Sequence, residues 1–261
     1  MKIAASDFDG TLYFPPDHFP GKNGIAEADV MAVSKWRQAG NIFGIVTGRN
    51  YQGLLRDSNR YGMEFDFAIC LTGAVIYDEE MRPLEQNPID NIVSREILLL
   101  PLLLESRHIA CFTAYETYVC IQSDESWFKS MINPSKYTEI DFFMAECLKG
   151  ICQISLQYSD KKKAAEITAQ INKMAIGVSA YQNMTAIDIV KDDTNKFVGL
   201  NKLLQMNNWH KNEIITIGDG DNDLPMITKL NGFTVESASD NVKCAATRVY
   251  KNVAALLNDK Y

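Results

Sequence analysis

Residues 3–12 read IAASDFDGTL, which is a short apolar run, two aspartates one residue apart, and a glycine turn. Side chains at positions i and i+2 of a strand share a face, so Asp7 and Asp9 are close neighbours of like charge. At 4 Å and an effective dielectric constant near 20, their repulsion is about 4 kcal/mol. The pair therefore indicates either a solvated Asx-turn loop or a site that holds a compensating cation.

A second acidic loop has the same construction near the other end of the chain. Residues 214–217 form an apolar strand pattern, residues 218–223 read GDGDND, and residues 224–227 begin an apolar helical pattern. The positive end of a helix dipole explains an aspartate at position 221 or 223, but it does not explain Asp219. Two such loops in one chain predict a site for a divalent metal at the carboxyl ends of strands. Clustered carboxylate oxygens suit Mg²⁺, which takes its remaining ligands from water and substrate phosphate.

Two further elements are typical of anion binding. The predicted strand 41–46 ends in Thr47-Gly48-Arg49, before a predicted helix over residues 50–61 that Gly62 closes. A hydroxyl group and free backbone N–H groups at the start of a helix bind anions. Lys196 begins another helical stretch. Taken alone, Thr47 is an ordinary helix cap and Lys196 an ordinary surface lysine.

The order of these four elements resembles the haloacid dehalogenase superfamily of phosphotransferases, which use an aspartate nucleophile. Leu12 after the first motif, Thr-Gly-Arg in the second, and the run Asn-Asp-Leu-Pro-Met-Ile at residues 222–227 are similar to its Cof-type subfamily. The resemblance covers residues 1–79 and 189–261. It implies an α/β fold, with a Rossmann-like, doubly wound parallel sheet as the core domain. It also implies that residues 80–188 form an inserted α+β cap domain of type IIB.

The resemblance also implies roles for individual residues. Asp7 would be the nucleophile, and Asp9 the general acid and base, giving the metal only its backbone carbonyl. The implied Mg²⁺ ligands are Asp7, Asp9 and Asp219; the implied phosphate-binding residues are Thr47, Gly48, Lys196 and Asn222; and the supporting residues are Gly10, Thr11 and Asp223. We further expect Lys196 and the metal to be the only positive charges opposing the acidic residues of the two loops.

Two positions depart from the family pattern. Thr72-Gly73-Ala74 stands where the family usually has Asn-Gly-Ala, and Lys196 is followed by Phe197-Val198-Gly199 in place of Gly-x-Ala. Neither change removes a residue needed for phosphoryl transfer. We therefore expect Thr72 and Phe197 to affect the shape of the substrate pocket more than the reaction.

The function that this resemblance implies is a Mg²⁺-dependent phosphatase. It would hydrolyse small phosphorylated metabolites, such as sugar phosphates, through an aspartyl-phosphate intermediate. Two alternatives remain: a phosphomutase or phosphotransferase of the same fold, and a catalytically silent protein that binds phosphorylated ligands. The sequence does not identify the natural substrate. Residues on predicted cap turns that could contact it are Tyr115, Tyr118, Tyr181 and Gln182.

Composition limits the class of partner. A net charge of −7 argues against a surface that binds nucleic acid or anionic membranes. The longest apolar run, residues 97–104, is too short to span a bilayer. The first residues lead directly into a predicted strand, so we expect no signal peptide. Six scattered cysteines favour free thiols in a reducing compartment. We expect a cytoplasmic enzyme, a monomer or weak homo-oligomer, with no nucleic-acid or membrane partner.

The sequence pattern also predicts local elements in the first half of the core and in the inserted segment. Residues 14–17 predict a turn-rich excursion, and residues 91–105 predict one helix kinked at Pro101. Residues 110–122 and 178–190 predict hairpins, the second turning at Gln182-Asn183.

Overall fold

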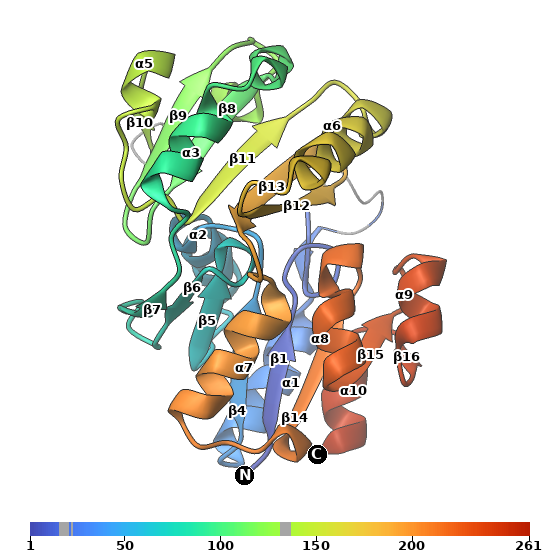
Figure 1. Ribbon diagram of the computed structural model, residues 1–261. Helices are drawn as coiled ribbons and strands as arrows, with labels where there is room; N and C mark the ends of the chain where they lie inside the picture. The colour runs from blue at the N-terminus through green and yellow to red at the C-terminus, as the bar shows by residue number, and fades with distance from the viewer. Residues whose placement is uncertain (16–20, 22, 131–136) are drawn as a thin grey trace. The chain divides into compact units, whose positions relative to one another are not determined.

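The computed structural model describes residues 1–15, 21, 23–130 and 137–261. It divides into two compact units, of which unit 1 comprises Met1–Leu84 and Asn195–Tyr261, and unit 2 comprises Glu85–Thr194. The cap interval expected from the sequence, residues 80–188, begins and ends a few residues before unit 2. Figure 1 shows the elements of both units.

Unit 1 is built on a sheet of eight strands (Figure 1). In spatial order they are β16 (Val249–Tyr250), β15 (Asn231–Val235), β14 (Ile214–Gly218), β1 (Ile3–Ser6), β4 (Ile42–Val46), β5 (Phe67–Cys70), β6 (Val75–Tyr77) and β7 (Pro83–Gln86). The strands from β16 to β5 pair in parallel, and β6 runs antiparallel to β5. A separate short hairpin joins β2 (Tyr13–Phe14) and β3 (Gly24–Ile25).

Helices alternate with the parallel strands along the chain of unit 1. They are α1 (Glu27–Gln38), α2 (Tyr51–Tyr61), α7 (Lys196–Met206), α8 (Leu224–Lys229), α9 (Asp240–Ala245) and α10 (Val253–Lys260). Figure 1 shows α7 in front of the sheet and α1 behind it, so the sheet is covered on both faces. The predicted doubly wound α/β core is confirmed.

Burial on both faces explains the apolar composition of the central strands. β1 and β14 are buried along their whole lengths, and Ile3, Phe43 and Ile45 are fully buried. Strands of a parallel sheet covered by helices on both faces are apolar throughout rather than alternating. β1 ends at Ser6, so Asp7 begins the loop that follows this strand.

Unit 2 is an α+β domain with a sheet of six strands. In spatial order they are β10 (Thr138–Glu139), β9 (Thr117–Ile121), β8 (His108–Phe112), β11 (Gln153–Gln157), β13 (Ala186–Lys191) and β12 (Val178–Asn183), and the helices are α3 (Asn91–Leu98), α4 (Trp127–Ser130), α5 (Phe142–Ala145) and α6 (Lys161–Met174). The strand pairs are antiparallel except β9 with β10. Side chains of α3, α6 and β11 share one apolar core, which includes Ile97, Ile154 and Ile167.

Two predictions for local structure are wrong, and part of a third falls on residues that the structure does not describe. The helix expected over residues 91–105 ends at Leu98, and a separate 3₁₀ turn covers Pro101–Glu105. Proline lacks an N–H donor and disfavours helical geometry at the residue before it, so the helix stops instead of bending. The second hairpin turns at Met184-Thr185, not at Gln182-Asn183, because Asn183 pairs with Ala186. Residues 16 and 17 of the expected excursion lie outside the described residues.

In the described ranges, no helix combines the length and the apolar character that crossing a bilayer requires.

Candidate active site

The predicted motif residues follow adjacent strands of the unit 1 sheet. Asp7 follows β1, Thr47 follows β4, and Asp219 follows β14, which are three neighbours in the sheet order. Parallel strands place their carboxyl ends at one edge, where open α/β sheets bind ligands. Lys196 reaches this edge from the first position of α7, whose N-cap Asn195 accepts a hydrogen bond from the N–H of Val198.

A buried ion-pair cluster lies at this edge. The Lys196 ammonium nitrogen is 2.5 Å from Asp7 Oδ1 and 2.6 Å from Asp223 Oδ1. All three side chains are buried, with Lys196 only 1% exposed. Burial lowers the pKa of Lys196, but the carboxylates of Asp223 and Asp7 outweigh burial and raise the pKa above its ordinary value. The lysine is therefore positively charged and paired with these two carboxylates.

Asp219 completes the acidic group. One carboxylate oxygen from each of Asp7, Asp219 and Asp223 lies within 4.8 Å of the other two. Asp219 accepts a hydrogen bond from the Thr11 hydroxyl at 2.9 Å. Burial and the charge of Asp223 raise the pKa of Asp219 to about 6, and burial raises the pKa of Asp7 well above its ordinary value.

The donor set fits a divalent cation. Three carboxylates and one ammonium group leave two negative charges, which one divalent ion would balance. Burial first, and then the neighbouring charge of Asp223, raise the pKa values of Asp7 and Asp219. Carboxylate oxygens are the ligands that hard divalent cations prefer. Asp223 belongs to this cluster by geometry, whereas the carboxylate of Asp9 has a different partner.

Two glycines make room for carboxylates of the second acidic loop. Gly10 has φ +86°, and a Cβ built there would lie 2.3 Å from Asp219 Oδ2. A Cβ at Gly218 would lie 2.4 Å from the Asp223 carboxyl carbon. Asp223 Oδ2 accepts hydrogen bonds from the N–H groups of Asp219 and Gly220, both at 3.0 Å. The second acidic loop is thus folded around one of its own carboxylates.

The loop after β5 supports the lysine. Leu71 and Thr72 adopt positive φ of 52° and 57°, and Gly73 has φ 101°. A Cβ at Gly73 would lie 2.2 Å from the carbonyl oxygen of Asn195, and one at Gly199 would lie 2.8 Å from the Gly73 carbonyl oxygen. Thr72 is buried at this contact. Thr72, which stands where the family usually has asparagine, is therefore next to the segment that positions Lys196.

The remaining predicted residues lie on the same edge with separate contacts. Thr47 is buried, and its hydroxyl oxygen accepts a hydrogen bond from the N–H of Arg49 at 3.1 Å. Gly48 lies between them in the turn after β4. Asn222 is partly exposed in the 3₁₀ turn of the second acidic loop. Phe197 packs under the ammonium group of Lys211, 5.2 Å from the ring centroid.

One expectation about charge is wrong. Arg49 is a further cation at this edge, and it binds both oxygens of Asp9 at 2.6 Å. In the sequence, Arg49 is only the last residue of the Thr-Gly-Arg motif, and no local pattern connects it with Asp9, which lies forty positions earlier. Asp221 is exposed, and it accepts a hydrogen bond from the side-chain amide of Asn241. It thus points away from the cluster.

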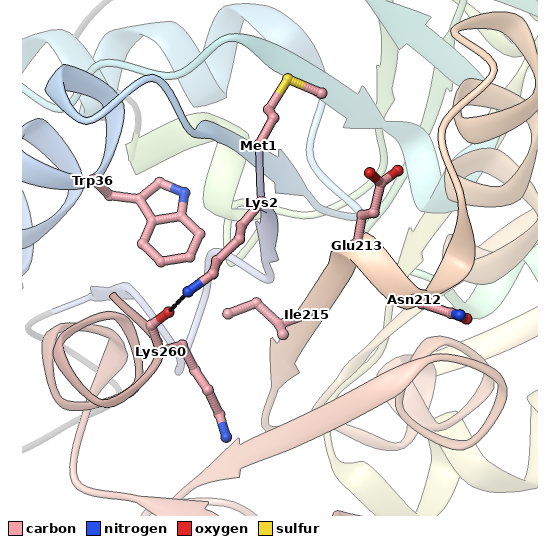
Figure 2. Close-up of a pocket in the computed structure, with 7 residues that line it drawn as sticks. All are labelled: Met1, Lys2, Trp36, Asn212, Glu213, Ile215 and Lys260. Atoms are coloured by element: carbon pink, nitrogen blue, oxygen red, sulfur yellow. Dashed lines mark hydrogen bonds between the residues drawn. The ribbon is translucent and has the colours of Figure 1, made fainter.

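A cavity of about 290 Å³ lies elsewhere in unit 1 (Figure 2). Its lining includes Met1 and Lys2, which precede β1, and Ile215 near the start of β14. It therefore lies at the amino ends of these strands, away from the motif loops. Lys2 donates a hydrogen bond to the carbonyl oxygen of Lys260 at 2.6 Å, which links the residue before β1 to the last residue of α10. This cavity holds none of the predicted site residues.

Comparison with known proteins identifies the family. The profile of the haloacid dehalogenase-like hydrolases matches residues 4–255, which is nearly the whole chain. The chain belongs to the haloacid dehalogenase-like hydrolase family. The resemblance inferred from the motifs is confirmed, and the protein is an enzyme of this hydrolase family.

Relatives of this hydrolase family cover both units. The chain is 22% identical over 269 aligned residues to the pyridoxal phosphate phosphatase YbhA of Escherichia coli, covering 95% of this chain and 92% of YbhA. A haloacid dehalogenase-like hydrolase from B. subtilis superposes with a TM-score of 0.84 at 20% identity, covering 99% of both chains. The subclass IIB sugar phosphatase BT4131 superposes with a TM-score of 0.78 at 19% identity, covering 99% of this chain and 97% of BT4131. At these identities the solved structures support the fold.

Proposed function

We propose that this hydrolase is a divalent-metal-dependent phosphatase of small phosphate monoesters, with Mg²⁺ as the metal. The observation that carries the proposal is the cluster at the carboxyl ends of β1 and β14, in which partly buried Asp219 lies beside buried Asp7, Asp223 and Lys196. The names of the relatives, a pyridoxal phosphate phosphatase and a sugar phosphatase, support the same class of reaction.

The proposed nucleophile is Asp7. Hydrolysis of a phosphate monoester in water is extremely slow, and a covalent intermediate divides it into two easier steps. The Asp7 carboxylate attacks phosphorus, the ester oxygen leaves, and an aspartyl phosphate remains. Water then attacks this intermediate, releases inorganic phosphate and restores Asp7. Lys196 lies 2.5 Å from Asp7, where its charge can stabilise negative charge on the transferring group.

The remaining roles fall to residues of the two acidic loops and of the loop after β4. Asp9 would protonate the leaving oxygen and then take a proton from the attacking water. Thr47, Gly48 and Asn222 would hold phosphoryl oxygens, as the family pattern implies. Asp7 and Asp219, with the Asp9 backbone carbonyl, would hold the metal, with Asp223 supporting them. When bound, the metal would offset negative charge on the phosphoryl group and on the cluster.

The first test is hydrolysis of an aryl phosphate with Mg²⁺, with chelator, and by Asp7→Asn. We expect activity that chelator abolishes, and a loss of at least about 10³-fold in Asp7→Asn because an amide cannot form the aspartyl phosphate. Asp221→Asn is the matched control, because this aspartate is exposed outside the cluster. An Asp7→Asn variant that retains a tenth of the parent rate would contradict the assignment of the nucleophile.

A substrate panel distinguishes the reaction types. It contains hexose phosphates and pyridoxal 5′-phosphate, because these classes match the names of the relatives. We expect release of inorganic phosphate from several members of the panel. Conversion of one hexose phosphate into an isomer without phosphate release would identify a phosphomutase. Binding of these esters without any turnover would identify a silent binding protein.

A further inference from the structure

The two aspartates of the first motif are paired with two different cations. Asp7 binds Lys196, whereas both oxygens of Asp9 accept hydrogen bonds from Arg49, from Nε and a terminal nitrogen, at 2.6 Å each. The planar guanidinium of arginine matches a carboxylate with two parallel hydrogen bonds, which determines the direction as well as the distance of the carboxylate. Each aspartate therefore has its own cationic partner, which offsets the repulsion expected between Asp7 and Asp9.

Arg49 is itself held from several sides. Its other terminal nitrogen lies 2.5 Å from Asp57 Oδ2, and the Asp57 side chain is only 6% exposed. The guanidinium carbon lies 4.9 Å and 4.8 Å from the ring centroids of Phe8 and Tyr13. Asp57 belongs to α2, two helical turns beyond Arg49, so the rigid helix anchors the arginine. These contacts leave the guanidinium little freedom to change its orientation.

We propose that Arg49, anchored by Asp57, is the positioning residue for the acid–base carboxylate Asp9. The inference rests on the proposed phosphatase function. Arg49 and Asp9 remain 20% and 29% exposed, and ion pairs of this exposure contribute little to stability. The value of the pair is therefore geometric: it aims the Asp9 carboxylate away from the metal-binding cluster and keeps both of its oxygens in one defined plane.

The first experiment is a double-mutant cycle between Arg49→Met and Asp9→Asn, measured as kcat/KM for an alkyl phosphate such as a hexose 6-phosphate. General acid–base catalysis contributes about 10²–10⁴-fold, so we expect Arg49→Met to lose about 100-fold in the parent. In the Asp9→Asn background the same substitution should change the rate by less than about twofold, because the residue that it positions is gone. Equal losses in both backgrounds would overturn the inference.

Two further variants separate geometry from charge and from stability. Arg49→Lys keeps the positive charge but not the two parallel hydrogen bonds. Its kcat/KM should therefore fall nearly as far as that of Arg49→Met, and parent activity in Arg49→Lys would overturn the inference. Asp57→Asn should weaken activity without touching Asp9, which provides a second variant if Arg49→Met does not fold. Arg56→Met is the matched control, because Arg56 also pairs with Asp57, at 2.7 Å, but has no recorded contact with Asp9 in the described chain. It should stay within about twofold of the parent.

The leaving group provides a readout that a structural defect would not give. A nitrophenolate leaves without a proton, whereas an alkoxide needs one from Asp9. Arg49→Met should therefore reduce kcat for the alkyl phosphate about tenfold more than for the nitrophenyl phosphate. Equal losses on both esters would overturn the positioning role alone. A parent protein that hydrolyses neither ester would overturn the proposed function, and the role of Arg49 with it.

Discussion

At the scale of single residues, the site is organised by how its carboxylates share two cations. Asp7 and Asp223 share Lys196, and Asp9 pairs with Arg49. Asp219 accepts a hydrogen bond from the Thr11 hydroxyl, and it forms no ion pair with a cationic side chain of the described residues. The carboxylate with the weakest compensation is thus the one most in need of a metal ion.

This difference predicts opposite effects of two substitutions. Asp219→Ala should weaken Mg²⁺ binding at least about tenfold, because it removes a carboxylate from the cluster. Asp9→Asn should leave metal affinity within about twofold, because the Asp9 side chain is occupied by Arg49, yet it should lower kcat about 10²-fold or more. Calorimetric titration of both variants with Mg²⁺ provides the measurement. The reverse order of metal affinities would show that the two roles are exchanged.

At the scale of elements, the close approach between the loop after β5 and the start of α7 determines where Lys196 points. Gly73 and Gly199 face each other there, with no room for a side chain at either position. Such contacts link the strand edge to the helix by backbone alone. We therefore expect the site to be sensitive to changes that never touch a charged group.

Gly73→Ala tests this expectation. The added Cβ would lie 2.2 Å from the Asn195 carbonyl oxygen, so we expect a loss of about 3 kcal/mol in the free energy of unfolding, and reduced activity because Lys196 moves. Gly40→Ala is the control, because Gly40 has a similar φ of 79° but nothing within 4 Å. It should cost about 1 kcal/mol and leave activity intact. Urea unfolding and aryl phosphate hydrolysis are the measurements, and equal effects of the two changes would contradict the prediction.

A buried histidine in unit 2 predicts how stability depends on pH. His108 of β8 is fully buried beside Trp127 and Phe128, with Nδ1 2.9 Å from the Ser126 hydroxyl, and burial lowers its pKa from 6.5 to about 3. The folded state therefore favours the neutral ring. Its contribution to stability is complete above pH 6.5 and falls between pH 6.5 and about 3, by about 1.4 kcal/mol per pH unit.

Comparison with His108→Gln isolates this contribution. The variant lacks the titrating ring. The free energy of unfolding of the parent minus that of the variant should therefore fall by about 1 kcal/mol when the pH falls from 7.5 to 5.5. Other titrating groups are common to both proteins and cancel in the difference. Urea unfolding at the two pH values is the measurement, and parallel pH dependence in parent and variant would refute the assignment.

At the scale of the whole molecule, the chain combines unit 1, whose sheet edge carries the proposed catalytic residues, with a separate α+β unit. In the proposed function, the cluster in unit 1 binds the phosphate group that all monoesters share, so we expect discrimination between esters to come from contacts with the rest of the substrate. Unit 2 is the large element available for this role. Among its proposed contact residues, Gln182 donates to two backbone carbonyls and Tyr181 to that of Thr194, whereas Tyr115 is 58% exposed.

Tyr115→Ala therefore tests whether unit 2 selects substrates. We expect kcat/KM to change by factors that differ about tenfold between esters, because the ring would contact the leaving group and not the phosphate. Thr47→Val, which removes a hydroxyl from the catalytic edge, should lower kcat/KM for all esters by the same factor. A panel of phosphate esters measured with both variants separates these results. Uniform losses from Tyr115→Ala would contradict a selective role.

The sequence alone determined the features that depend on local order. The alternation of strands and helices, the glycine turns and the placement of motif residues at strand ends follow from side-chain periodicity and from turn chemistry within a few residues. The tertiary structure decided which distant groups meet. Lys196 reaches Asp7 across 189 positions, and Arg49 takes Asp9 across forty, because packing brings separate strand ends to one edge. Periodicity predicts that edge, but which carboxylate receives which cation depends on side-chain geometry that exists only in the folded protein.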